Sequence, residues 1–434
     1  MEPVLVGIVC LCLFFFLIYI GMPIGFAFMA VGFLGFGLVR NFGSACYLLA
    51  SVPYTWASSY SMVVIPLFIL MGQFAYESHI SEDLYQVAYK WAGSQPGGIA
   101  LATTLACTLF AACTGSSLAS AATMGTVAIP ELRRFRYSSR LATGCVAAGG
   151  TLGILIPPSV VFIVYGLLTS TSIGKLFIAG VLPGLLVCVC FLAYIYVRCT
   201  LDPTLGPRGP KIHWPEKFKS VVGVWGMLTL FVVIIGGLYL GLFTPTEAGA
   251  VGAFASFVIV VLRGRLEKSG FISAVVGTVR TTAMIFTILI GAQIFNGFLT
   301  LSGIPAKLAS FVGSLPVPSY VTLIAILIMY VPLGMLMDGL PMILLTLPTI
   351  FPIVSALGHD PIWFGVLVCM MCELANITPP MGMNLYIIKG VAGEEIPIQE
   401  VVMGAAPFTC VLLACVAIIF IFPQIALYFP GLMR

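Results

Sequence analysis

The chain has 434 residues, of which 60% are hydrophobic and only 8% are charged, with a formal net charge of +4 at pH 7. Because soluble domains carry roughly a quarter charged residues, this composition excludes an ordinary soluble protein and indicates a polytopic protein of the lipid bilayer. The small positive charge fits basic cytoplasmic loops and gives no reason to expect nucleic-acid binding.

The first apolar region, residues 3–39, is too long for one membrane span. We therefore expect two helices that meet near Gly21–Gly25. A short segment near Cys46–Trp56 precedes a third span, which is predicted near residues 59–75. The mixed stretch 81–92 has its apolar residues at helical spacing, which is typical of a helix lying along the membrane interface.

Residues 99–132 are apolar at both ends and polar at the centre, Cys113–Ser117. Two legs of about 15 residues reach only ~22 Å each, which favours a re-entrant hairpin with its tip at Ser116. A single long tilted helix is the alternative. Arginines follow the hairpin, and residues 141–168 then read as a span broken at Gly150–Ser159, where two prolines interrupt it.

After a further span, residues 201–219 form a polar linker, and the second half repeats the order of the first. Its predicted elements are spans near 221–240, 248–262 and 281–299, an interfacial piece at 304–312, a hairpin at 319–357, a broken span at 363–391 and a last span near 402–422. The second hairpin is polar at Asp338–Gly339, and the second broken span carries Glu373-Leu-Ala-Asn-Ile-Thr-Pro-Pro-Met-Gly-Met-Asn384.

Proline positions relate the two halves, because Pro157 and Pro379 differ by 222 residues (379 − 157), as do Pro23 and Pro245. Ser116 and Asp338, the two candidate hairpin tips, obey the same shift. We therefore predict two repeats, residues 1–200 and 220–434.

The orientation of the repeats depends on the hairpins. With re-entrant hairpins each repeat has five full spans and the second is inverted, whereas with single spans the repeats are parallel. Counting Lys and Arg by the positive-inside rule gives the same totals for both topologies. The base of the first hairpin is rich in arginine and the base of the second, 358–361, has neither Lys nor Arg, which favours inversion.

Each hairpin tip is expected to face a broken span, where prolines leave carbonyls without helical donors. Hydroxyls, amides and free carbonyls are hard oxygen ligands that suit Na⁺. The first predicted site contains Ser116, Ser117, Gly150, Thr151, Gly153 and Pro157. The second contains Asp338, Gly339, Asn376, Thr378 and Pro379. Substrate contacts between them are expected from Thr114, Ser159, Gly382 and Asn384. A proline kink satisfied by a neighbouring helix is the structural alternative.

Three motifs resemble the large membrane subunit of TRAP (tripartite ATP-independent periplasmic) transporters. They are Gly241-Leu-Phe-Thr-Pro-Thr-Glu-Ala248, Gly150-Thr-Leu-Gly-Ile-Leu-Ile-Pro-Pro-Ser159 and Glu373-Leu-Ala-Asn-Ile-Thr-Pro-Pro-Met-Gly382. The resemblance covers essentially the whole chain. It implies an all-α, elevator-type fold with inverted repeats, a mobile hairpin domain and a scaffold.

The resemblance also implies Na⁺-driven uptake of an organic acid, such as a C4-dicarboxylate or sialic acid. Expected partners are a small four-span membrane subunit and a periplasmic binding protein that delivers the substrate. The expected location is the bacterial inner membrane, with both termini in the periplasm. A carboxylate substrate sits poorly beside Glu373 and Asp338, so the sequence leaves the role of these two acids open.

Two other functions share parts of this sequence pattern. A divalent-anion/Na⁺ symporter that works alone would share the hairpins and the proline breaks. An intramembrane protease would need a base beside its serine or a second aspartate beside Asp338, yet no histidine falls in a predicted span and no second aspartate lies at membrane depth. We therefore expect a transporter and no enzyme activity.

Overall fold

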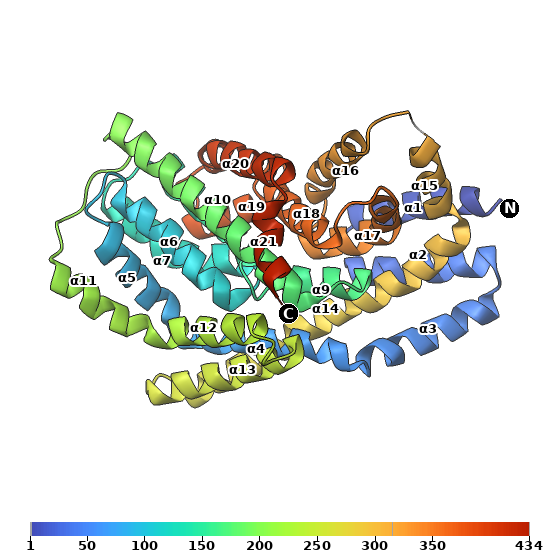
Figure 1. Ribbon diagram of the computed structural model, residues 1–434, viewed down its shortest axis with the longest axis horizontal. Coiled ribbons are helices and arrows are strands. Elements are labelled where there is room, and N and C mark those ends of the chain that lie inside the picture. The colour runs from blue at the N-terminus through green and yellow to red at the C-terminus, as the bar shows by residue number, and fades with distance from the viewer. Residues whose placement is uncertain (1, 315, 434) are drawn as a thin grey trace.

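The structure, a computed structural model, describes residues 2–314 and 316–433, and in that part of the chain the regular elements are helical (Figure 1). The first half forms α1 (Pro3–Tyr19), α2 (Ile24–Val39), α3 (Phe42–Ala57), the 3₁₀ turn η1 (Tyr60–Val63), α4 (Val64–Glu77), α5 (Ile80–Ala92), α6 (Gly98–Thr114), α7 (Ser117–Arg134), α8 (Ser139–Leu155), α9 (Val160–Thr169) and α10 (Ile173–Leu201).

The second half forms α11 (Trp214–Val221), η2 (Val222–Val224), α12 (Trp225–Tyr239), α13 (Pro245–Leu262), α14 (Lys268–Ser302), α15 (Ile304–Ser314), α16 (Ser319–Gly334), α17 (Gly339–Ala356), α18 (Pro361–Asn376), α19 (Met383–Ala392), α20 (Ile398–Ile421) and α21 (Gln424–Leu432). The predicted interfacial stretches correspond to α5 and α15, which precede the two predicted hairpins.

Between α10 and α11, Thr204 donates two hydrogen bonds to the Asp202 carboxylate, one from its backbone N–H and one from its hydroxyl. These bonds stabilise the charged form and lower the pKa of Asp202.

In one group of helices, glycines allow the backbones to pack closely. α14 crosses α2 so closely that a Cβ at Gly32 would lie 2.6 Å from the Phe295 backbone nitrogen. Phe14 of α1 stacks on Phe28 of α2 at 4.6 Å between ring centroids, and Phe295 of α14 packs against both. Small residues let helix backbones approach in a membrane, where apolar burial alone gives little driving force. With α3, α4, α12 and α13, these helices form one packed body.

A second group surrounds α18. Every residue of α18 from Trp363 to Asn376 is buried, and α8, α10, α16, α17 and α20 pack around it. α8 is buried in the same way from Leu141 to Leu155. A helix that is apolar and buried on all sides is a core element, so the two helices that end at the proline pairs lie at the centre of the second group.

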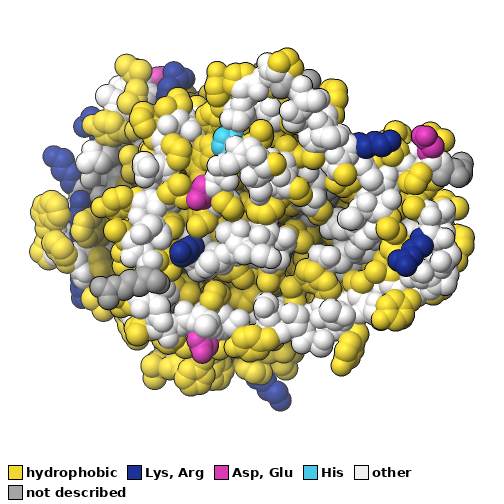
Figure 2. Space-filling model, turned by 45° about the vertical axis from the view of Figure 1, so that its right-hand side comes forward, with side chains coloured by type: hydrophobic (Ala, Val, Ile, Leu, Met, Phe, Trp, Pro, Cys, Tyr) yellow, Lys and Arg dark blue, Asp and Glu magenta, His cyan; other side chains and the backbone are white. Residues whose placement is uncertain are grey.

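The outer surface is apolar. Eight helical segments of the described chain are long and apolar enough to cross a membrane. Figure 2 shows hydrophobic side chains spread across one face, with Lys and Arg gathered mainly at its left and right edges. Exposed apolar patches of this extent indicate contact with lipid or with membrane partners.

The bounds of three elements differ from the sequence-based predictions. α14 begins at Lys268, ahead of the predicted start at 281, so Arg280 lies inside a 35-residue helix. The stretch near Cys46–Trp56 is a full helix, α3, of 16 residues. α8 continues through Gly150, Thr151 and Gly153 to Leu155. A glycine costs a helix only about 1 kcal/mol, whereas Pro157 blocks it, so only residues 156–159 are irregular.

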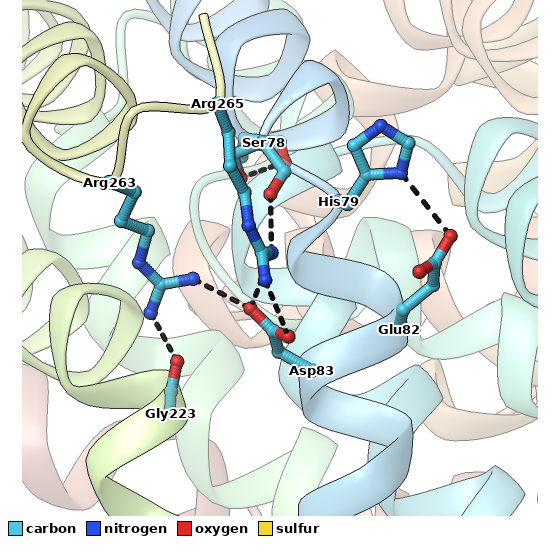
Figure 3. A network of polar contacts seen from close by, with 8 residues as sticks. Ser78, His79, Glu82, Asp83, Gly223, Arg263 and Arg265 are labelled. Atoms are coloured by element: carbon cyan, nitrogen blue, oxygen red, sulfur yellow. Dashed lines mark hydrogen bonds and ion pairs between the residues drawn. The ribbon is translucent and has the colours of Figure 1, made fainter.

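A polar network fixes the joint between α4 and α5 (Figure 3). Asp83 of α5 accepts hydrogen bonds from Arg263 at 2.7 Å and from Arg265 at 2.8 Å, and Arg265 also donates to the Ser78 carbonyl at 3.0 Å. Arg263 donates in addition to the Gly223 carbonyl. The network therefore ties α5, which leads into α6 and α7, to the loop between α13 and α14.

Candidate functional site

The turn between α6 and α7 packs directly against the first proline pair. Gly115 has a φ of +58°, and a Cβ there would lie 2.6 Å from the Pro158 carbonyl oxygen. A Cβ at Gly153 would lie 2.6 Å from the Ser116 carbonyl oxygen. Only glycine allows both approaches. The structure therefore brings the turn at Gly115–Ser117 together with Gly153 and the proline pair.

Hydrogen bonds hold most side chains of this first turn. The Ser116 hydroxyl caps α7 by accepting from the Ala119 N–H, and the Thr114 and Ser120 hydroxyls lie 2.6 Å apart. Thr151 donates to the Ala148 carbonyl at 2.6 Å within α8, so its hydroxyl is an internal helix contact. Because Pro157 has no N–H, the Gly153 carbonyl lacks its usual helical donor.

The second turn places an acid where the first has a serine. Asp338 is the N-cap of α17, yet within residues 2–314 and 316–433 its side chain makes no capping bond and its buried Oδ1 atom has no hydrogen-bond partner. Gly339 lies against α18, since a Cβ there would be 3.2 Å from the Cys372 Cβ. Asn376, the last residue of α18, is fully buried, and no described residue forms a hydrogen bond with either of its side-chain amide atoms.

The residues after α18 differ in exposure from those after α8. Residues 156–159 are buried, whereas Pro379, Pro380 and Met381 are exposed. Thr378 donates to the Leu374 carbonyl at 2.5 Å, so its hydroxyl extends the end of α18. Gly382 packs on the Asn376 carbonyl, from which a Cβ would be 2.7 Å away.

A buried hydrogen-bond chain connects the two halves. Asn384 of α19 donates to the Ser117 hydroxyl at 2.8 Å, and Ser117 of α7 donates to Glu373 Oε2 at 2.8 Å. From the sequence, Asn384 was expected to contact the substrate, and the role of Glu373 was left open. In the structure both side chains meet Ser117 of the first turn, a contact between residues 256 positions apart in the case of Glu373.

The remaining substrate candidate, Ser159, is fully buried. Its hydroxyl accepts from the Phe162 N–H at 3.3 Å and so caps α9. Ser159 and Asn384 are thus both engaged in buried hydrogen bonds, while Thr114 is half-buried beside the first turn.

Four buried side-chain oxygens in this region have no hydrogen-bond partner among the described residues, namely Asp338 Oδ1, Glu373 Oε1, Asn376 Oδ1 and Asn384 Oδ1. Asn376 follows Glu373 by one helical turn in α18, and Gly339, next to Asp338, packs on Cys372, the neighbour of Glu373. In the described part of the chain neither acid forms an ion pair with a basic side chain. Buried oxygen acceptors without donors favour a bound cation.

The apolar helices α8 and α18 both end at proline pairs, in a region with buried carboxylates and amides. This arrangement is typical of a polytopic membrane transporter. Over residues 11–425 the chain matches the family described as "Tripartite ATP-independent periplasmic transporter, DctM component". The chain therefore belongs to the TRAP transporter family as its large permease component, a transporter subunit and not an enzyme.

Relatives across the family support this assignment. The chain is 36% identical over 385 residues to the C4-dicarboxylate TRAP transporter large permease protein of Pseudomonas aeruginosa, covering 88% of this chain and 89% of that protein. It is 33% identical over 421 residues to the sialic acid TRAP transporter large permease protein of Vibrio cholerae, covering 96% of each.

A solved structure shares the fold. The Alcanivorax borkumensis YdaH transporter aligns over 91% of both chains with a TM-score of 0.66 at 17% sequence identity. This similarity extends to the fold alone.

Proposed function

We propose that this chain is the large transmembrane subunit of a Na⁺-coupled TRAP transporter that takes up an organic acid by an elevator-type mechanism. The printed names of its relatives include transporters for a C4-dicarboxylate and for sialic acid. Both compounds are carboxylates, which supports a carboxylate as the substrate of this chain.

The proposal includes a small four-span membrane subunit and a periplasmic binding protein as partners, in the bacterial inner membrane with both termini in the periplasm. The family description names a tripartite system. The isethionate TRAP permease protein DctMQ of Oleidesulfovibrio alaskensis, 33% identical, is matched by 99% of this chain over only 66% of its own length. The extra length of that relative leaves room for a fused small subunit.

The recurring order of the helices supports the internal repeat that the inverted topology requires. α7 and α17 begin 222 residues apart (339 − 117) and each has 18 residues, and α8 and α18 also begin 222 residues apart (361 − 139). Crevices of about 250 Å³ between α5, α6 and α7 and about 410 Å³ between α15, α16 and α17 occupy matching positions, since Ile99 lines the first and Val321 the second.

The observation that carries the Na⁺ assignment is the set of buried oxygens without donors around Asp338 and Asn376. Carboxylate and amide oxygens are hard ligands that suit a small monovalent cation, and in the described part of the chain no basic side chain pairs with either acid. Asp338 and Asn376 would hold one Na⁺, and Ser117 with the Gly153 carbonyl would hold another. Bound Na⁺ supplies the positive charge that lets buried carboxylates and an anionic substrate share one region.

In the elevator, the group built around α8 and α18 moves against the group built around α2 and α14. Each turn of the moving group, Gly115–Ser117 and Asp338–Gly339, rests on a broken helix end, so ligand binding between them stabilises a closed unit. The Asp83 network joins α5, which leads into the moving group, to the loop between α13 and α14 of the other group, and so lies where the two groups connect.

Purified protein tests the cation assignment through thermal unfolding in NaCl compared with choline chloride. A specific ligand at 100 times its Kd stabilises by about 2.7 kcal/mol, so NaCl should raise the Tm of the wild type. Ser117→Ala and Asn376→Ala should each reduce this response. Asn296→Ala, a buried asparagine of α14 with a free Oδ1, is the matched control and should retain it. Equal responses in wild type and both site variants would contradict the assignment.

A further inference from the structure

Glu373 occupies a position between the two proposed cation sites. Its side chain is 1% exposed, Oε2 accepts the Ser117 hydroxyl at 2.8 Å, and Oε1 has no hydrogen-bond partner among the described residues. Ser117 belongs to the first turn. Asn376, three residues after Glu373 and so on the same face of α18, belongs to the second site.

With Glu373 ionised, the hydrogen-bond chain has one consistent direction. Asn384 Nδ2 donates to the Ser117 oxygen, so the single Ser117 proton goes to the Glu373 carboxylate. A hydroxyl has two lone pairs, and Asn384 uses one of them. Glu373 therefore orients Ser117 so that one remaining lone pair is available for a ligand of the first turn.

This connection has no counterpart in the other half of the chain. The positions 222 residues before Glu373 and Asn384 are Thr151 and Phe162. Thr151 bonds within its own helix to Ala148, and Phe162 has no polar atom in its side chain. The link from one site to the other consequently runs through Glu373 and not through a symmetric pair.

We propose that Glu373 is a positioning residue that couples the two cation sites, so that Na⁺ binds to them cooperatively. The inference rests on the proposed Na⁺ coupling. A cation beside Asp338 and Asn376 offsets the repulsion between Asp338 and Glu373 and fixes the Glu373 carboxylate. Through its bond to Ser117, the fixed carboxylate prepares the first turn for the next cation.

The coupling requires both the charge of Glu373 and its bond to Ser117, and two variants separate them. Glu373→Gln keeps an acceptor for Ser117 but removes the charge. Glu373→Asp keeps the charge but is one methylene too short to hold the bond. Tyr330→Phe is the control, because it removes a buried hydrogen bond to Thr346 at 2.9 Å between α16 and α17.

The test is a Na⁺ titration of each purified protein, followed by intrinsic fluorescence and by Tm, with choline keeping the ionic strength constant. The wild type and Tyr330→Phe should bind Na⁺ with a Hill coefficient above 1. Both Glu373 variants should bind with a coefficient near 1 and a midpoint raised roughly 5- to 100-fold, while remaining folded without Na⁺. A merely structural role would lower the Tm and leave the Hill coefficient unchanged.

The outcomes separate this inference from the proposed function. If the wild type binds Na⁺ cooperatively and either Glu373 variant has the same Hill coefficient, the coupling role is overturned and the Na⁺ assignment stays intact. A wild type that does not respond to Na⁺ would overturn the Na⁺ assignment and the coupling with it.

Discussion

At the crossing of α8 and α20, single atoms decide how close two helices come. A Cβ at Gly144 would collide with the Gly404 carbonyl oxygen, and a Cβ at Gly404 would collide with the Arg140 carbonyl oxygen. The contact is backbone on backbone, so no side chain can move aside to make room. Arg140 and Glu400 add a two-bond ion pair, each bond at 2.9 Å, near the same crossing.

Gly404→Ala should therefore push α8 and α20 apart and lower stability by about 1–3 kcal/mol, measured as a lower Tm in detergent. Gly390→Ala is the matched control, because Gly390 lies within α19 and a Cβ there meets nothing within 4 Å. The control should be neutral or slightly stabilising. An unchanged Tm for Gly404→Ala would contradict the close backbone contact between α8 and α20.

The sequence singled out most polar residues of the site but did not predict all of their contacts. The polar residues of the turns and proline breaks stood out from their apolar surroundings, and the structure brings Ser116 next to Gly153 and Asp338 next to Asn376. The contacts of Ser117 with Glu373 and Asn384 were not predicted. Helical periodicity indicates which residues share one face of a helix, but it does not indicate which distant helix packs against that face. A lone carboxylate in an apolar run was the one available signal.

At the scale of elements, polar contacts hold α5 in place, because Asp83 is the shared acceptor of Arg263 and Arg265. Asp83→Asn should lower stability by roughly 1–3 kcal/mol, since Arg263, only 12% exposed, would lose its carboxylate. The neighbouring Glu82 pairs with His79 in an exposed position. Glu82→Gln should change stability by less than about 0.5 kcal/mol. Comparable losses of Tm in the two variants would contradict a special role for the Asp83 network.

Element types and order followed from the sequence better than element ends did. The proline pairs predicted two broken helices, and helices do end before each pair. The expected break at Gly150 was wrong because glycine weakens a helix without stopping it, while proline removes a donor and clashes with the preceding turn. The start of α14 was missed because Lys268 and Arg280 sit where a membrane span is not expected, although a helix can extend beyond the bilayer.

At the scale of the whole molecule, inverted repeats require that equivalent positions face opposite sides of the membrane. Arg134 and Ala356 are exposed and 222 residues apart (356 − 134), at the ends of α7 and α17. We expect a membrane-impermeant maleimide added to spheroplasts to label Ala356→Cys, and to label Arg134→Cys only after permeabilisation. The exposed Cys12, Cys46 and Cys410 should first be replaced by serine. Labelling of both positions from one side would contradict the inverted topology.

The most direct test of Na⁺-driven, binding-protein-dependent uptake is transport into proteoliposomes that contain this chain and the small membrane subunit. Uptake of the cognate organic acid should require both an inward Na⁺ gradient and the loaded periplasmic binding protein. It should stop when choline replaces Na⁺ or when the binding protein is omitted. Uptake by this chain alone, without a binding protein, would contradict the account and identify a stand-alone symporter.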